Sequence, residues 1–194
     1  MSTFQLYLTL GLQHIADFKG YDHILFIITL CAVYQLRDWK NILILVTAFT
    51  IGHSLTLVLA TFNIVRISGD LIEFLIPVTI LLTAVGNILQ KKDSFSKSHH
   101  RYKYGLAMFF GLIHGLGFSN YLRSLLSSED SLAVPLFSFN LGIEIGQLII
   151  VSIFLLFGLL LLNLMKFKPR EWNLLISGAG IGISLILIFE RIPF

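Results

Sequence analysis

The sequence is poor in charge: Asp, Glu, Lys and Arg make up 13% of its 194 residues, whereas 56% are hydrophobic. A soluble domain of this size carries about a quarter charged residues. The composition therefore excludes an ordinary soluble protein and predicts an all-α integral membrane protein that forms a single domain over residues 1–194. The small net charge of +3 gives no reason to expect a nucleic-acid partner.

Several kinds of motif are also missing. The single cysteine, Cys31, excludes an internal disulfide. The sequence contains no P-loop, no G-x-G-x-x-G, no paired cysteine motif and no G-x-S-x-G. No basic segment precedes the first apolar stretch, so we expect no cleaved signal peptide. The remaining candidates for functional residues are the ionisable residues inside apolar segments. Such groups are costly in a bilayer, so their presence there indicates a function by default.

Apolar segments separated by polar loops predict six or seven transmembrane helices. Six spans follow from residue 22 onward, at 22–36, 41–63, 71–90, 104–122, 133–163 and 172–190. Residues 3–17 are apolar but short, because at ~1.5 Å per residue they barely cross a ~30 Å hydrocarbon core. This first segment is either a tilted seventh span or a helix that lies in one leaflet.

Lys and Arg gather in alternate loops, which predicts the orientation of the chain. The loops with Arg37 and Lys40, with Lys91 to Lys103, and with Lys166 to Arg170 hold most of the cations. Cytoplasmic loops carry such an excess, so we place these three inside. The protein is then a multi-pass protein whose C-terminus lies outside.

The stretch His14–His23, which reads HIADFKGYDH, puts two histidines and two acids into ten residues of an apolar chain. Neutral imidazoles and carboxylates are also the side chains that bind divalent metals. Gly20 permits a bend between the two halves. We therefore expect a short helix–turn–helix at the outer surface, with metal ligands at the turn.

Other ionisable residues share a depth with this turn. His53 lies ten residues before the outer end of its helix, His114 eight residues before, and Glu144 about eleven residues into its helix. At ~1.5 Å per residue all three lie ~12–16 Å from the outer side. Glu73 lies near the outer end of its own span. Scattered polar residues have no reason to share a depth, whereas a site open to the outside gives them one.

Polar neighbours accompany these residues. Asn140 and Gln147 recur with Glu144 at helical spacing, and Ser54 follows His53. Such groups either orient metal ligands or bond neighbouring helices together. Gly111 and Gly115, which flank His114, form a G-x-x-x-G pair that permits close helix approach.

These motifs resemble the HupE/UreJ family of small bacterial membrane proteins. The resemblance rests on HIADFKGYDH followed by Leu25-Phe26, on FTIGHSLTL, on Glu73 with Asn87, on FGLIHGLGF and on FNLGIEIGQL, between about residues 11 and 150. It implies a nickel-type permease of the bacterial inner (cytoplasmic) membrane.

Three functions remain open. The first is a permease that carries a divalent transition metal inward. The second is an intramembrane metal-dependent hydrolase, because three histidines and an acid with an open position also activate water on catalytic zinc. The third is a protein that stores metal or hands it over. A permease needs polar groups that continue to the cytoplasm, and beyond Thr79, Thr83 and Asn87 the inner half of the sequence is nearly all apolar.

Residue type and shared depth together select the candidate site residues. The predicted metal ligands are His14, Asp22, His23, His53, His114 and Glu144. The predicted supporting residues, which orient the ligands, are Ser54, Glu73, Asn140 and Gln147. Nickel, zinc and copper all accept imidazole, so spacing alone does not choose among them. The expected partners are the metal ion and the lipid bilayer, with the chain present as a monomer or a homo-oligomer.

Overall fold

A computed structural model describes residues 2–90, 97–126, 131–164, 166 and 168–193. All regular elements in these residues are helical, which agrees with the predicted all-α class. The elements are α1 (Thr3–Ile15), α2 (Asp22–Cys31), η1 (Leu36–Asp38), α3 (Trp39–Thr61), α4 (Gly69–Leu89), α5 (Lys97–Gly117), α6 (Ser119–Leu126), α7 (Ala133–Leu164) and α8 (Pro169–Glu190).

Four of the described helices, α3, α4, α7 and α8, are long and apolar enough to cross a membrane. The protein is therefore a membrane protein. Helices α1 and α2 are shorter, with 13 and 10 residues. At ~1.5 Å per residue they reach ~20 Å and ~15 Å, less than a ~30 Å hydrocarbon core. The predicted count of six or seven spans is not confirmed, and residues 22–36 contain a half-length helix in place of a full span.

Local sequence explains where several helices begin. The Ser2 hydroxyl accepts the backbone N–H of Gln5 and so caps α1. The Ser68 hydroxyl accepts the N–H of Leu71 and caps α4 in the same way. Pro169 opens α8, where its missing N–H costs no helical hydrogen bond.

Glycines let two pairs of helices approach backbone to backbone. A Cβ atom on Gly52 or Gly111 would overlap a carbonyl oxygen of the facing helix in the α3–α5 pair. Gly11 and Gly142 play the same part between α1 and α7. The close approach predicted for Gly111 and Gly115 is therefore present in the structure. It draws the histidine-bearing faces of α3 and α5 together, because a Cβ on Gly115 would meet the carbonyl oxygen of His53.

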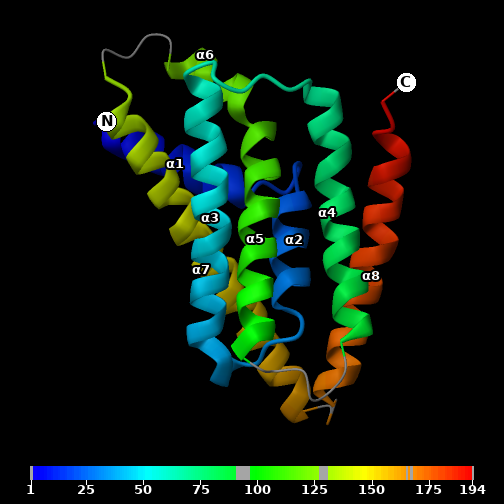
Figure 1. Ribbon diagram of the computed structural model, residues 1–194. Coiled ribbons are helices and arrows are strands. Elements are labelled where there is room, and N and C mark those ends of the chain that lie inside the picture. The colour runs from blue at the N-terminus through cyan, green and yellow to red at the C-terminus, as the bar shows by residue number, and fades with distance from the viewer. Residues whose placement is uncertain (1, 91–96, 127–130, 165, 167, 194) are drawn as a thin grey trace.

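The turn between α1 and α2 lies between the two ends of the helix bundle, at neither of them. Figure 1 shows α2 starting partway along α3 and α5 and running toward the end at which α3 begins. The ring of His23, at the start of α2, lies 6.1 Å from the ring of His53. His53 precedes Thr61, the last residue of α3, by eight residues, or ~12 Å. The expected helix–turn–helix is present, but its expected place at the outer surface is not confirmed.

Cationic residues that are distant in the chain meet at one end of the bundle. Arg37, Lys168 and Arg170 line a single pocket at the end where η1 and the start of α8 lie. The C-terminus and α6 lie at the opposite end (Figure 1). Lys91 and Lys92, which were assigned to the same cationic side, lie outside the described residues. Basic residues that were predicted to share one side of the membrane thus lie at one end of the described part of the fold.

We expect Gly111→Ala to lower the stability of the protein by about 1–3 kcal/mol, because the added methyl group would push α5 away from the Phe49 carbonyl. Gly105→Ala is the matched control on the same helix, since a Cβ there meets nothing within 4 Å. Thermal unfolding of both purified variants in detergent measures the difference. Equal melting temperatures would contradict the close-packing account.

Candidate metal centre

Three histidines from three different helices come together inside the bundle. His14 lies in the last turn of α1, His23 in the first turn of α2 and His53 in the C-terminal half of α3. One ring nitrogen from each lies within 4.8 Å of the other two. His53 is fully buried and His23 is 6% exposed. The structure thus joins the two histidines of the α1–α2 stretch to one that follows 30 residues later.

Four ring nitrogens of this group have no hydrogen-bond partner among the described residues. Nε2 of His14, Nε2 of His23 and both nitrogens of His53 are buried and unpaired. Buried polar groups are hydrogen-bonded as a rule, because an unpaired one forfeits its hydration without compensation. Several such atoms that face one another call for a ligand that accepts lone pairs, and a metal cation is one.

The spacing suits a transition metal after a small closure. Imidazole nitrogens bind zinc at ~2.0–2.1 Å, so three nitrogens around one tetrahedral ion would lie about 3.4 Å apart. Nitrogens within 4.8 Å of one another would have to approach by up to about 1.4 Å to reach that separation. A set of three imidazoles accepts nickel, zinc and copper alike.

Asp22 lies beside His23 and orients it. Oδ1 of Asp22 accepts the backbone N–H of His23 at 3.1 Å and lies 3.4 Å from its Nδ1. A carboxylate at Nδ1 leaves Nε2 as the free ligand atom. Oδ2 of the same carboxylate accepts Nη1 of Arg191 at 2.9 Å. Asp22 therefore holds a ligand on one side and a guanidinium on the other.

His114 lies against the group but is held by another partner. Its ring centroid is 5.2 Å from that of His23. Its Nε2 lies 2.9 Å from the Thr79 hydroxyl, which donates its single proton to the carbonyl of Ile76 at 2.7 Å. This contact engages Nε2 of His114 and leaves its buried Nδ1 without a hydrogen-bond partner among the described residues.

Glu144 lies outside the three-histidine group, on the face of α7 that meets α3. The Thr47 hydroxyl donates to its Oε1 at 2.6 Å, and its Oε2 is buried without a partner. Asn140 and Gln147 pair with α3 as well: Ser54 donates to Asn140 at 2.6 Å and Thr50 donates to Gln147 at 2.8 Å. These contacts bond α7 to α3. Of the three α3 residues that make them, only Ser54 is next in sequence to a histidine of the group.

A pocket of about 320 Å³ gives access to the histidines. Its walls include His14, Asp22, His23, Glu73 and Arg191. Glu73 is exposed at its mouth, and the backbone carbonyl of Glu73 accepts Arg191 at 3.4 Å. Glu73 thus lines the pocket that leads to the site but does not belong to the histidine group itself.

Two residues that contact this site were not among the site residues predicted from the sequence. No motif gave Arg191 a role, and Thr79 was interpreted only as a polar residue of the inner half. No linear pattern connects Arg191 with Asp22, because 169 positions separate them. The i, i+4 recurrence of Thr79, Thr83 and Asn87 was the signal that a polar face of α4 turns inward.

The fold and the site define a helical membrane protein with a histidine cluster buried between its helices. A family model described as HupE / UreJ protein matches residues 1–190. The chain belongs to the HupE/UreJ family, which confirms the resemblance expected from the motifs. No curated protein and no solved structure matches the chain.

Proposed function

We propose that the protein is a permease that binds a divalent transition-metal ion and carries it across the membrane. The observation that carries the proposal is the set of facing, buried and unpaired ring nitrogens of His14, His23 and His53. Membership of the HupE/UreJ family supports a transporter over an enzyme. Nickel is the ion that the family favours, and zinc and copper fit the same ligands.

The proposed orientation follows from charge. The end of the bundle with Arg37, Lys168 and Arg170 lies in the cytoplasm, by the positive-inside rule. The C-terminus and the pocket beside Glu73 then lie on the outer side of the inner membrane. We propose that α5 spans with α3, α4, α7 and α8, and that α1 and α2 meet as two half-helices.

Half-helices that meet inside a membrane support a transport role. Non-helical backbone at membrane depth is tolerated where it lines a cavity, and broken helices build the ion sites of many transporters. Here the interrupted segment runs from Ala16 to Tyr21, and its two ends carry His14 and His23. The interruption and the proposed ligands therefore coincide.

The proposed route inward runs along α4 and α8. Thr79, Thr83 and Asn87 follow at helical spacing on α4. From α8, Asn173 donates to the carbonyl of Asn87 at 3.0 Å and Ser177 donates to Asn173 at 2.9 Å. Thr83 is half-buried, and the other members of this route are buried. The inner half is thus more polar than its sequence indicated, because α8 adds side chains that no motif had connected with α4.

This route weighs against the alternative, an intramembrane hydrolase. Such an enzyme would use the same histidines, with the open position of the ion facing the pocket beside Asp22 and Glu73. It would need a pocket on one side only. A permease requires buried polar residues beyond the cluster, and a hydrolase does not.

Glu144 is proposed as a transient ligand of the ion on the α3–α7 side of the histidines, which the ion leaves again for the route along α4 and α8. It lies one helical turn beyond Asn140 on α7, and its Oε2 is a buried, unpaired carboxylate oxygen. Ser54, Asn140 and Gln147 are proposed to position this face of α7 against α3. Asp22 and His114 are proposed to complete the metal-binding site around the three histidines.

We expect the purified protein to bind about one Ni²⁺ or Zn²⁺ ion per chain, as a three-imidazole site would. His53→Ala should weaken binding more than tenfold, because it removes a fully buried ligand. Metal analysis after equilibrium dialysis measures both. His100→Ala, at the opposite end of the bundle, should bind like the wild type. Equal metal content in all three proteins would remove the proposed site.

Flux in proteoliposomes separates transport from binding. His23→Ala should abolish both metal binding and entry. Glu144→Gln should retain binding within about twofold, because this residue lies outside the three-histidine group. It should lower flux about tenfold, because it removes the proposed transient ligand of the ion. Asp70→Asn, in the exposed first turn of α4, is the control. Stoichiometric binding with no flux in the wild type would favour storage or hand-over.

Arg191 should tune the affinity of the site. Its guanidinium holds Oδ2 of Asp22, so Arg191→Gln frees that carboxylate to face the ion. We expect metal binding to tighten about tenfold, as for a charge released at short range. In an Asp22→Asn background the same substitution should change affinity little, since the guanidinium is no longer held there. Lys19→Gln, an exposed cation of the turn, is the control, and equal affinities of Arg191→Gln and wild type would contradict the account.

A further inference from the structure

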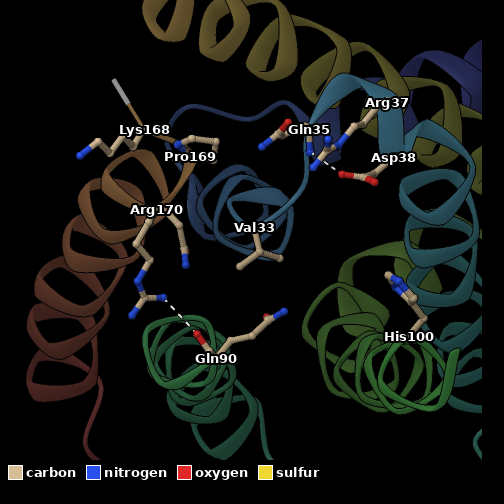
Figure 2. A pocket seen from close by; sticks show the side chains of 10 residues that line it. Val33, Gln35, Arg37, Asp38, Gln90, His100, Lys168, Pro169 and Arg170 are labelled. Carbon is tan, nitrogen blue, oxygen red and sulfur yellow. Dashed lines mark hydrogen bonds between the residues drawn. The ribbon is translucent and has the colours of Figure 1, made fainter. Parts of the chain in front are cut away.

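A second pocket lies at the cationic end of the bundle, and no histidine of the metal centre lines it. It encloses about 640 Å³ between the end of α4, the starts of α5 and α8, and the segment that joins α2 to α3. Figure 2 shows its side chains ringing an open space. The lining, which we call the inner pocket, consists of Val33, Gln35, Arg37, Asp38, Gln90, His100, Lys168, Pro169, Arg170 and Asn173.

The inner pocket carries an excess of positive charge. Arg37, Lys168 and Arg170 contribute three cations against the single carboxylate of Asp38. One oxygen of Asp38 is already engaged, because it accepts the backbone N–H of Gln35 at 3.0 Å. Arg170 is anchored in the wall: its guanidinium donates to backbone carbonyls at the end of α4, among them Ile88 at 2.6 Å. Arg37 and Lys168 are exposed and can move toward a ligand.

A further cation backs the wall of the inner pocket. Nζ of Lys103 donates to the side-chain oxygen of Gln90 at 2.7 Å and lies 5.4 Å from the centre of the Tyr34 ring. This bond turns the amide of Gln90 so that its NH₂ group remains as a donor. Gln35 and Asn173 add amide groups to the same lining. The pocket therefore combines mobile cations with neutral donors, the set that surrounds phosphate oxygens in proteins.

The pocket lies at the level of a membrane surface. Trp39 begins α3 next to it, is 56% exposed, and has Nζ of Lys40 5.5 Å from its ring centre. Exposed tryptophan at the end of an apolar helix is typical of the headgroup region. Leu36, also exposed, borders the same segment. A ligand in the inner pocket would thus share its depth with the headgroups of the cytoplasmic leaflet.

We propose that the inner pocket binds the phosphate group of an anionic phospholipid, with Arg37 and Lys168 as the residues that select its charge. Basic pockets between transmembrane helices on the cytoplasmic side bind such headgroups. The volume exceeds that of inorganic phosphate and leaves room for the glycerol of a lipid. The proposal does not depend on metal transport.

The proposal also bears on the route described above. Asn173 belongs both to the polar residues that continue inward from the histidines and to the lining of the inner pocket. Without an anion, three cations would repel a divalent ion that arrives there. A bound phosphate group would offset that charge.

Native mass spectrometry of the full chain in detergent tests the proposal, with phosphatidylglycerol and phosphatidylcholine of identical acyl chains as probes. The wild type should retain phosphatidylglycerol preferentially. The double variant Arg37→Gln/Lys168→Gln should lose that preference, by about fivefold for each cation removed. Both side chains are exposed, and the anchoring Arg170 is left unchanged, so the fold is expected to persist. Thermal unfolding of the variant checks this.

A double variant with the same loss of charge at the other end, Lys19→Gln/Arg66→Gln, is the matched control and should keep the preference. Equal retention of both lipids by the wild type, or an unchanged preference in Arg37→Gln/Lys168→Gln, would overturn the proposal. A third arm titrates inorganic phosphate alone. Binding of free phosphate that depends on Arg37 and Lys168, without any preference between the lipids, would identify a soluble phosphate as the ligand and overturn the lipid assignment.

Discussion

The close backbone approach of α3 to α5, and of α1 to α7, is the constraint on which the site depends. Buried imidazoles with unpaired nitrogens are unfavourable in a helix bundle, so tight packing elsewhere has to compensate. Gly52 and Gly111 bring α3 against α5, and Gly11 and Gly142 bring α1 against α7. The same contacts carry His53 and His14 inward. The histidine cluster is thus a consequence of where these helices lack side chains.

Within the cluster, the imidazoles differ in whether a second residue holds one of their nitrogens. Asp22 lies at Nδ1 of His23, Thr79 fixes Nε2 of His114, and both nitrogens of His53 are unpaired. A group whose other nitrogen is held presents a defined ligand atom, whereas a free ring can rotate toward an ion. The site therefore combines rigid members with an adaptable one, which suits an ion that must be bound and then released.

The two ends of the bundle differ in charge. The pocket that reaches the histidines has three acids, Asp17, Asp22 and Glu73, with Arg191 as its cation. The inner pocket has three cations and one acid. An acidic mouth concentrates cations near its entrance, and a basic one disfavours their return. This difference in charge agrees with the proposed entry of a cation at the acidic end.

Composition and residue counting determined much of this protein: a helical membrane chain, and histidines 14, 23, 53 and 114 at a common depth. Counting works because each helical residue adds a fixed rise along the axis. The direction in which a side chain points around that axis depends on which helix packs beside it. Only the tertiary structure could therefore place Glu144 against Thr47, outside the histidine group, and bring Arg191 to Asp22. For the same reason it alone showed that α2 is a half-helix whose first turn lies inside the bundle.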